Sequence, residues 1–406
     1  MNILFLTLLD FDSLEERGIY TDLLREFVKD NHKVYIVSPT ERRKKQPTRL
    51  IENGNCRILK LQIGNIQKTN IIEKGISTFF LESQFQRGVR KYFFNIKFNL
   101  VIYSTPPITL QKAIKDVKKR NNAKTYLLLK DIFPQNAVDL GMMRKNGIQG
   151  VLYKYFRAKE DELYQISDFI GCMSQANVDY ILNHNKGLSR DIVEICPNTL
   201  EPRRMLYKDQ KNEIIKKKYN IPINKTVFIY GGNLGKPQGI DFLIKCVDAN
   251  KNNKQVHFVI VGAGTEFNKI KAYFDKEQPP NAQLFRQMSK YEYEVLEGLC
   301  DVGLIFLDRR FTIPNFPSRI LSYMQASIPV LAATDCNTDV GKVIESGEFG
   351  FWCESGNVKE FNHRMDLLCD AELRERMGSK AREYLEEYYT ARHSYEIIMK
   401  HFKKNV

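Results

Sequence analysis

Ser318 and Arg319 stand where a proline-containing loop runs into an amphipathic helix, within the segment 314–332. A helix start exposes free backbone N–H groups and the positive end of the helix dipole, which together attract anions. Ser318 is expected to cap the helix, and Arg319 can grip a phosphate through two parallel N–H bonds. The buried side of the helix is expected to consist of Ile320, Leu321 and Met324. Taken alone, the segment fits a phosphate site and an ordinary helix start about equally.

A second group of residues suited to phosphate or sugar binding lies in the glycine-rich segment 230–239, directly after a predicted strand. Its four glycines, Gly232 among them, let the backbone approach a ligand closely. Asn233, Lys236 and Gln238 add hydrogen-bond donors. No G-K-[ST] sequence closes the loop, so it is not a P-loop. Four glycines are more than a plain tight turn needs, which favours a binding function.

A third strand-to-turn segment, Val261–Glu266, contains Gly262 and Gly264 and begins like a dinucleotide-binding fingerprint. Phe267 stands where the third glycine of that fingerprint belongs. The first strand of the chain is not followed by a G-x-G either. The segment therefore gives only weak support to a dehydrogenase.

Three residues in the first half of the chain are also placed for binding. Asp131 follows the predicted strand Thr125–Leu129 and either orients an acceptor hydroxyl or caps the next helix. Arg17 and Gly18 open the first predicted helix, where an anionic group would be stabilised by the helix start.

Metal-ligand spacings are missing from the sequence. The six histidines show no H-E-x-x-H and the eight cysteines no C-x-x-C, which indicates reduced thiols and no metal site. Asp10 and Asp12 formally match the metal-binding pair D-x-D, but they end the first strand and are expected to form a solvated turn. The apolar N-terminal segment lacks a basic start and is interpreted as that strand, not as a signal peptide.

Short apolar runs alternate with amphipathic helical runs along the whole chain, the pattern of parallel α/β sheets. The predicted strands of a first series are Ile3–Leu8, Val34–Val37, Leu100–Tyr103, Thr125–Leu129, Phe169–Met173 and Val193–Cys196. A new series consists of Thr226–Tyr230, His257–Val261, Leu304–Leu307 and Val330–Ala333, with helices near Asp241–Asn250 and from Glu266. We therefore expect two Rossmann-like doubly wound domains, divided near Pro197–Lys208, that bind ligands at the carboxyl ends of their strands.

The charge of +14 is unevenly distributed. Residues 1–205 hold 33 Lys and Arg against 22 Asp and Glu, whereas the remainder is nearly balanced. A basic half indicates an anionic partner, such as lipid headgroups, a phosphorylated substrate or nucleic acid, or else only surface lysines. Basic residues 42–45 and the aromatic and basic run 79–94 fit an interfacial membrane helix or a core helix with a basic outer face. No run of about 20 apolar residues predicts a transmembrane helix.

Together these motifs resemble the retaining glycosyltransferases of family 4, which have the two-Rossmann GT-B architecture. The order G-G-N-L-G-x-x-Q-G, V-G-A-G-T and P-S-R-x-L-S-Y-M is similar to the branch that contains bacterial N-acetyl-fucosamine transferases of capsule and O-antigen synthesis. The family's E-x7-E carboxylates would fall near Pro314 and Ser322, neither of which is acidic. What holds the ribose of a donor is therefore open.

The resemblance implies a domain organisation and a set of site residues. It implies an acceptor-binding domain over residues 1–203, a donor-binding domain over 204–385 facing it across a cleft, and a C-terminal helix, 386–406, that returns to the first domain. The catalytic candidates are Arg319, Lys236 and Asp131. The donor-binding candidates are Gly232, Asn233, Gln238, Gly262, Gly264, Arg286, Pro317, Ser318, Ser322 and Tyr323. The acceptor-binding candidates are Arg17, Gly18 and Asn198.

The implied activity is metal-independent transfer of a sugar, expected to be an N-acetylated aminosugar, from a UDP-sugar to a lipid-linked saccharide. The chain would then be cytoplasmic, attached peripherally to the inner membrane, and free of cofactors and nucleic acid. Two alternatives share the fold: a UDP-sugar 2-epimerase, and a non-catalytic nucleotide-sugar-binding subunit. Without a carboxylate nucleophile, the leaving phosphate would accept the proton of the acceptor hydroxyl.

Overall fold

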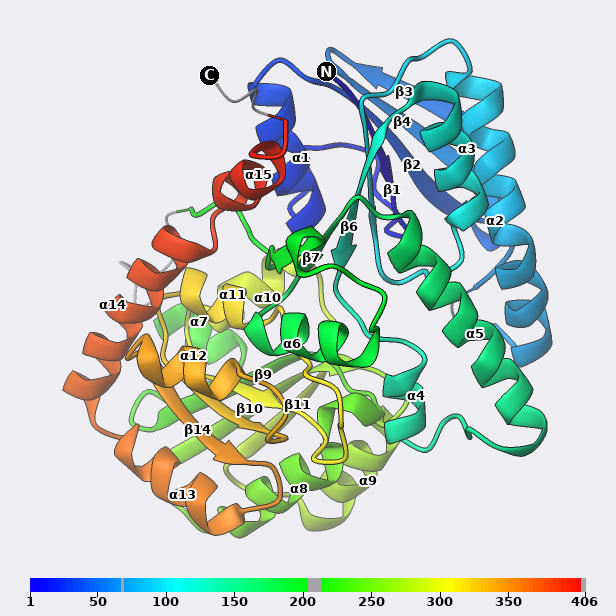
Figure 1. Cartoon of the computed structure of the whole chain (residues 1–406). Helices are drawn as coiled ribbons and strands as arrows, with labels where there is room; N and C mark the ends of the chain where they lie inside the picture. Colours follow the sequence, from blue (N-terminus) through cyan, green and yellow to red (C-terminus); the bar gives the residue numbers. More distant parts are fainter. Residues whose placement is uncertain (67–68, 204–212, 403–406) are drawn as a thin grey trace. The chain divides into compact units, whose positions relative to one another are not determined.

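The computed structural model describes residues 1–66, 69–203 and 213–402. The chain forms two compact units: unit 1 comprises residues 1–201 with the C-terminal residues from Ala391, and unit 2 comprises Pro202–Thr390. Both are built from parallel strands alternating with helices (Figure 1). The expected fold class, two Rossmann-like α/β domains, is confirmed.

Unit 1 is built on a sheet with the order β3-β4-β2-β1-β5-β6-β7-β8, in which only β3 is antiparallel to its neighbour within the described residues. Its strands are β1 (Asn2–Leu6), β2 (Lys33–Glu41), β3 (Arg49–Asn53), β4 (Cys56–Ile63), β5 (Leu100–Ser104), β6 (Lys124–Leu129), β7 (Phe169–Cys172) and β8 (Val193–Ile195). The strand order reverses direction between β1 and β5. In such sheets ligands bind beyond the carboxyl ends of the strands at this reversal.

The helices that cover this sheet are α1 (Ile19–Lys29), α2 (Ile71–Phe93), α3 (Gln111–Asn121), α4 (Gln135–Asp139), α5 (Gly147–Ile166) and α6 (Gln175–His184), with short 3-10 turns η1 (Arg42–Lys44) and η2 (Arg190–Ile192). The last helix, α15 (Ala391–Met399), also belongs to unit 1. Its Tyr395 ring packs edge-on against Phe27 of α1, with ring centroids 4.8 Å apart, and Figure 1 shows α15 beside α1. The expected return of the C-terminal helix to the first domain is confirmed.

Unit 2 holds a parallel sheet with the order β11-β10-β9-β12-β13-β14. Its strands are β9 (Thr226–Asn233), β10 (Val256–Ala263), β11 (Ala282–Arg286), β12 (Val302–Phe306), β13 (Val330–Thr334) and β14 (Gly350–Glu354). Counted along the chain this order is 3-2-1-4-5-6, that of a dinucleotide-binding sheet, and the reversal lies between β9 and β12.

The helices of unit 2 are α7 (Glu213–Lys218), α8 (Ile240–Ala249), α9 (Phe267–Glu277), α10 (Lys290–Glu297), α11 (Ile320–Gln325), α12 (Val340–Ser346), α13 (Val358–Leu367) and α14 (Ala371–Tyr388), with the 3-10 turn η3 (Lys236–Gln238) after β9. The central strands are buried on both faces, as expected when helices cover a parallel sheet. This is why they form continuous apolar runs and were identifiable from the sequence.

Tyr323 of α11 packs directly on Gly303 of β12, and its hydroxyl links the two central strands, β9 and β12. Its ring is fully buried, and its hydroxyl donates to the carbonyls of Ile229 on β9, at 3.2 Å, and Leu304 on β12, at 2.9 Å. A Cβ added at Gly303 would lie 2.2 Å from Tyr323 Cγ. Only glycine therefore fits beneath this ring.

Gly303→Ala is expected to lower the free energy of unfolding of unit 2 by about 1–3 kcal/mol, because the added methyl group overpacks a fully buried contact. The fluorescence of Trp352, which is the chain's only tryptophan and lies on β14, reports unfolding of this unit in guanidinium chloride. In a Tyr323→Leu background the same change should cost less, since the ring is gone. Equal costs in both backgrounds would contradict the contact.

Candidate functional site

The reversal between β9 and β12 brings two loops of unit 2 together. The loop after β9 contains η3, and the loop after β12 runs to the start of α11. A backbone hydrogen bond of 2.9 Å from Asp308 N–H to the Pro237 carbonyl joins them. Four cationic side chains come from these loops, and three of them, Lys236, Arg309 and Arg319, have no carboxylate partner among the described residues.

Gln238 holds the shape of the glycine-rich loop. Its side-chain oxygen accepts hydrogen bonds from Asn233 Nδ2, at 3.1 Å, and from Gly235 N–H, at 3.3 Å. Gly232 adopts a φ of 124°, which side-chain-bearing residues rarely reach. Lys236 is exposed and has no ion-pair partner among the described residues. Asn233 and Gln238 thus shape the loop, and Lys236 is its available charge.

Gly262 and Gly264, predicted to contact a donor, allow the turn after β10 to pack on the glycine-rich loop. A Cβ at Gly262 would lie 2.0 Å from the Gly232 carbonyl oxygen, and one at Gly264 would lie 2.3 Å from the Leu234 carbonyl. Leu234 N–H also donates to the Ala263 carbonyl at 2.9 Å. These glycines therefore act through loop packing.

Arg319 presents a buried positive charge with no carboxylate partner among the described residues. Its guanidinium carbon lies 4.2 Å from the centroid of the Tyr230 ring, and Nη2 lies 3.5 Å from where a Cβ of Gly232 would be. Its Nη1 is shielded from solvent and lacks a hydrogen-bond partner. A buried cation without a counter-charge is costly unless an anion completes the site.

Helix α11 begins at Ile320 with Arg319 as its N-cap residue, and no side chain caps it. The predicted capping by Ser318 is therefore wrong, because the helix starts one residue later than that role needs. Ser318 and Pro317 are half-buried in the preceding loop. The predicted buried side of the helix is confirmed: Ile320, Leu321 and Met324 are at most 3% exposed.

A buried carboxyl group that the sequence did not reveal lies behind Ser322. Glu297, at the end of α10, is 1% exposed and accepts a hydrogen bond from Ser322 Oγ at 2.8 Å. Burial raises the pKa of Glu297 to about 7, while hydrogen bonds from Ser322 and Tyr293 oppose the rise. Ser322 Oγ also donates to the Arg319 carbonyl at 2.9 Å. Glu297 thus supports the Arg319 backbone through Ser322.

Two other predicted donor residues, Tyr323 and Arg286, do not add to the group of three cations. The Tyr323 hydroxyl already bonds the sheet carbonyls described above, so we assign this residue a role in packing and not in donor binding. Arg286 ends β11, which β9 and β10 separate from β12 in the sheet. Its guanidinium carbon lies 4.8 Å from the centroid of the Phe267 ring.

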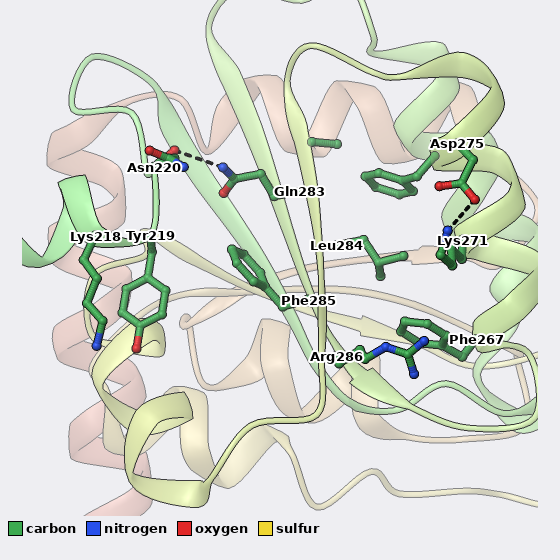
Figure 2. Close-up of a pocket in the computed structure, with 12 residues that line it drawn as sticks. Lys218, Tyr219, Asn220, Phe267, Lys271, Asp275, Gln283, Leu284, Phe285 and Arg286 are labelled. Carbon is green, nitrogen blue, oxygen red and sulfur yellow. Dashed lines mark hydrogen bonds and ion pairs between the residues drawn. The ribbon is translucent and has the colours of Figure 1, made fainter.

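Arg286 and Phe267 belong to a pocket of about 430 Å³ at the β11 edge of unit 2. Figure 2 shows Arg286 against the Phe267 ring, with Tyr219 and Phe285 on the neighbouring wall. Lys271 of this pocket is already paired with Asp275 at 2.5 Å. The pocket therefore offers aromatic surfaces and one guanidinium.

Arg309 is a functional candidate that the sequence analysis missed. It is exposed just beyond β12, and the neighbouring Arg310 pairs with Asp308 at 2.7 Å. Arg309 has no ion pair among the described residues, and its Nη1 lies 3.5 Å from where a Cβ of Gly356 would be. Its position after a central strand, in the sequence Asp308-Arg309-Arg310, was the available signal.

In unit 1 the corresponding position holds Asp131, just beyond β6. Burial raises the pKa of its carboxyl group to about 6, and the negative charge contributes to a raised pKa, about 12, for Tyr20 of α1. Thr105 Oγ1 accepts the N–H groups of Lys130, at 2.9 Å, and Asp131, at 3.1 Å. The start of α1 and the end of β6 thus meet at a carboxyl group that is easily protonated.

Lys130, which precedes Asp131 in the chain, connects the end of β6 to the loop after β8. Burial lowers the pKa of Lys130 to about 8, and its Nζ donates to the Cys196 carbonyl at 2.9 Å. Asn198, predicted to bind the acceptor, is buried two residues further along. The loop after β8 therefore borders the loop after β6.

The start of α1 does not favour the anion expected at Gly18. The Gly18 N–H donates to the Asp22 carboxylate at 3.3 Å, so a negatively charged side chain already occupies the position that an anion would take at this helix start. Arg17 precedes it in a half-exposed to exposed turn. We therefore do not retain an anion site at Gly18 and Arg17.

The D-x-D segment is an exposed loop, as expected, and both of its carboxylates also form ion pairs. The fully buried Lys60 binds the carboxylates of Asp10 and Asp12, the latter at 3.1 Å, and Lys44 pairs with Asp10 at 2.5 Å. Lysine charge thus neutralises both acids. Across residues 1–66, 69–203 and 213–402, no three His, Cys, Asp or Glu side chains gather in a group that could hold a metal ion.

Glu297→Gln should alter how the stability of unit 2 depends on pH. Because burial raises the pKa of Glu297 from 4.5 to about 7, its protonated form stabilises the fold below about pH 4.5, and this contribution is lost as the pH rises through 7. Relative to the Gln variant, the parent chain should lose about 3 kcal/mol between these limits.

This difference is measured by guanidinium unfolding of both chains, followed by Trp352 fluorescence from pH 4.5 to above 7. The control is Glu345→Gln, which changes an exposed carboxylate of α12 in the same unit. A pH-independent difference between the parent and Glu297→Gln chains would show that Glu297 titrates normally.

Comparison with known proteins finds a family model that matches part of the chain. Residues 211–384 match the family model described as Glycosyl transferases group 1. The chain is 22% identical over 333 residues to the "Probable glycosyltransferase WbjE" of Pseudomonas aeruginosa, covering 80% of this chain and 78% of that protein. It is 22% identical over 250 residues to WcaI of Escherichia coli K12, named as a glycosyl transferase of colanic acid biosynthesis, covering 61% of this chain and 60% of that protein.

Solved structures show the same fold over nearly the whole chain. Sucrose-phosphate synthase of Thermosynechococcus elongatus superposes with a TM-score of 0.76 at 13% identity, covering 99% of this chain and 98% of that one. HepE of Anabaena in complex with UDP-glucose superposes with a TM-score of 0.66 at 14% identity, covering 99% of both chains. Residues 211–384 are therefore similar to the Glycosyl transferases group 1 model, within a chain that has the two-domain fold of these solved structures.

Proposed function

We propose that this protein is a retaining glycosyltransferase that moves a sugar from a UDP-sugar to a hydroxyl group of a lipid-linked saccharide, in the synthesis of a bacterial surface polysaccharide. The observation that carries the proposal is Arg319, whose buried guanidinium has an unpartnered Nη1 at the reversal of a nucleotide-binding sheet. Matching relatives named as glycosyltransferases support it.

The difficult step is departure of a diphosphate as its negative charge grows. Positive groups that are fixed before the reaction stabilise such charge without reorganising. Arg319 is held by the Tyr230 ring, and Arg309 and Lys236 come from loops that meet at the same reversal. We propose that these three cations take the place of a metal ion.

Retention of the anomeric configuration requires the acceptor to attack from the face that the diphosphate leaves. The bond between the anomeric carbon and the phosphate oxygen breaks, and a bond to the acceptor oxygen forms. The acceptor proton passes to the departing phosphate oxygen. Near Arg319, Glu297 is buried behind Ser322 and Asp308 is paired with Arg310, so neither carboxyl group is placed as a nucleophile.

The uridine end of the donor would lie toward the pocket of Arg286 and Phe267. β11 and β12 are three strand spacings apart, or about 14 Å at the usual spacing. An extended nucleoside diphosphate can place its base at one strand end and its diphosphate at the other. The UDP-glucose complex of the Anabaena protein supports UDP as the carrier. We also propose that the transferred sugar is an N-acetylated aminosugar.

The acceptor half of the reaction is assigned to unit 1. Asp131, whose pKa burial raises to about 6, would be ionised at neutral pH and orient the acceptor hydroxyl by accepting its hydrogen bond. The lipid-linked acceptor would bring the chain to the inner face of the cytoplasmic membrane. No nucleic acid is required.

Arg319→Ala should lower kcat/KM by about two to three orders of magnitude, because one fixed donor to the developing charge is lost. The assay measures release of the nucleoside diphosphate from a panel of UDP-, GDP- and dTDP-sugars, with a polyprenyl-diphosphate saccharide as acceptor. Arg319→Lys should recover only part of the loss, since lysine keeps the charge but lacks the planar pair of donors.

Arg364→Ala is the matched control. Arg364 also lies over an aromatic ring, Phe351, at 5.3 Å, but it pairs with Glu360 at 2.8 Å in the same unit. Its loss should leave kcat/KM within about fivefold. A change of less than fivefold for Arg319→Ala in a folded chain would contradict the proposal, and formation of an epimer of the donor without any acceptor would identify the epimerase alternative.

A further inference from the structure

Helix α5 exposes a continuous apolar stripe on its first half. The exposed fractions are 93% for Ile148, 71% for Val151, 47% for Leu152 and 45% for Tyr155. Positions three and four residues apart lie on one face of a helix, so these four side chains form one strip. Single exposed apolar residues are common, but a strip of four large ones is not.

Helix α2 exposes a second apolar group, formed by Ile76, Phe79 and Phe80. Phe79, at 72%, is its most exposed member, and its ring packs edge-on against Phe80 with centroids 5.4 Å apart. The later aromatic residues Phe85 and Phe93 are buried in the core of unit 1. Phe94, at the end of the run 79–94, is 65% exposed, and the run also exposes Arg87, Arg90 and Lys91. Beyond its apolar start the run therefore fits the alternative of a core helix with a basic outer face.

The contacts of α3 show that α2 and α5 run in the same direction on either side of it. Along α2, Glu82 bonds Lys112 N–H of α3 at 2.7 Å, and Arg90 then pairs with Asp116. Along α5, the Lys159 carbonyl accepts from Gln111 at 2.5 Å, and the Ile166 carbonyl accepts from Lys118 at 2.9 Å. Both helices thus follow α3 from its start to its end.

The exposed apolar residues precede these contacts on both helices, so both apolar groups extend past the start of α3. About 11 residues of α2 and 12 of α5 lie before the first contact, or about 16–18 Å of helix each. Figure 1 shows both helices continuing beyond α3 toward the same end of unit 1. A helix that follows a parallel strand begins at the carboxyl end of the sheet, where Asp131 also lies.

The same end of unit 1 is basic. Residues 140–159 contain five Lys and Arg and no Asp or Glu. Arg144 and Lys145 are exposed just before α5, and Lys154 is exposed within it. Arg42 of η1 also reaches this end, because it pairs with Glu73 in the first turn of α2 at 3.2 Å.

We propose that the exposed beginnings of α2 and α5 form a surface that docks on an anionic lipid bilayer. Apolar side chains between exposed cations insert at the boundary of headgroups and acyl chains, and the cations attract anionic headgroups. A second copy of the chain would bring two basic surfaces face to face in a symmetric dimer, which charge repulsion opposes. No helix within the described residues is long and apolar enough to cross a membrane.

This docking surface gives the proposed acceptor a physical route to Asp131, an inference that rests on the proposed function. A lipid-linked saccharide held in the bilayer would be met by the end of unit 1 that carries this carboxyl group. Lipid binding itself does not require transfer, so the two proposals can fail separately.

The test is flotation of the full chain with vesicles of phosphatidylcholine, with and without phosphatidylglycerol. The chain should bind the anionic vesicles, and Ile148→Ser/Val151→Ser should weaken this binding by about tenfold or more. Ile223→Ser removes an exposed apolar side chain, 59% exposed, from unit 2 and should leave binding unchanged. Replacing Arg144, Lys145 and Lys154 by Gln should weaken binding to the anionic vesicles and abolish its salt dependence.

A second measurement does not depend on the loss of binding. Leu152→Trp should show a blue shift in its emission, and quenching by brominated lipid, when anionic vesicles are added. Absence of binding by the parent chain, unchanged binding by the Ser variant, or no shift of the new tryptophan would overturn the proposal. A dimer in solution that Ile148→Ser/Val151→Ser converts to a monomer would also overturn it, in favour of self-association.

Stabilisation of the parent and the Ser variant by UDP separates this result from the proposed function. Equal stabilisation by UDP with lost flotation would place the defect in lipid docking alone. If no UDP-sugar stabilises the parent chain but the chain still floats with anionic vesicles, the docking proposal is supported and the proposed donor is contradicted.

Discussion

The contact between the Arg319 guanidinium and the Tyr230 ring is the constraint around which the loops of unit 2 are arranged. It keeps a charge at the end of the central strand, and Gly232 leaves room beside it because it has no side chain. No described carboxylate neutralises that charge, whereas the exposed Arg310 nearby pairs with Asp308. A protein that served stability alone would gain from a counter-charge at this position. The arrangement is therefore that of a site completed by an anion.

Ser322 and Glu297 show how this site is supported from behind. The second carboxylate of the E-x7-E pattern of family 4 would fall near Ser322, which is not acidic. The structure places the Glu297 carboxyl group against that serine, from a different helix. It is buried, its pKa is raised to about 7 by that burial, and it bonds Ser322, whose hydroxyl also lies against the Arg319 carbonyl. Glu297 thus supports the Arg319 backbone instead of pairing with the guanidinium. The two units thus differ in chemistry: fixed positive charge in unit 2, and the easily protonated Asp131 in unit 1.

The sequence was sufficient for those features that depend on local patterns. Buried central strands are apolar throughout, so their order and the two domains were predictable. The edge strand Ala282–Arg286 was not predicted, since it is only partly buried and short. Glu297 was also missed, because its partner lies 25 positions further along the chain and no spacing rule connects them. The cap assigned to Ser318 failed because a one-residue shift in a helix start changes which residue takes the N-cap.

The most direct test of the anion site is calorimetric titration of the full chain with UDP, UMP and uridine. UDP should bind most tightly, and uridine should lack the contribution of the phosphates. Arg319→Met, which keeps an unbranched side chain but removes the charge, should weaken UDP binding by about tenfold to a hundredfold while leaving the affinity for uridine unchanged. Equal binding of UDP by the parent chain and by Arg319→Met would contradict the account.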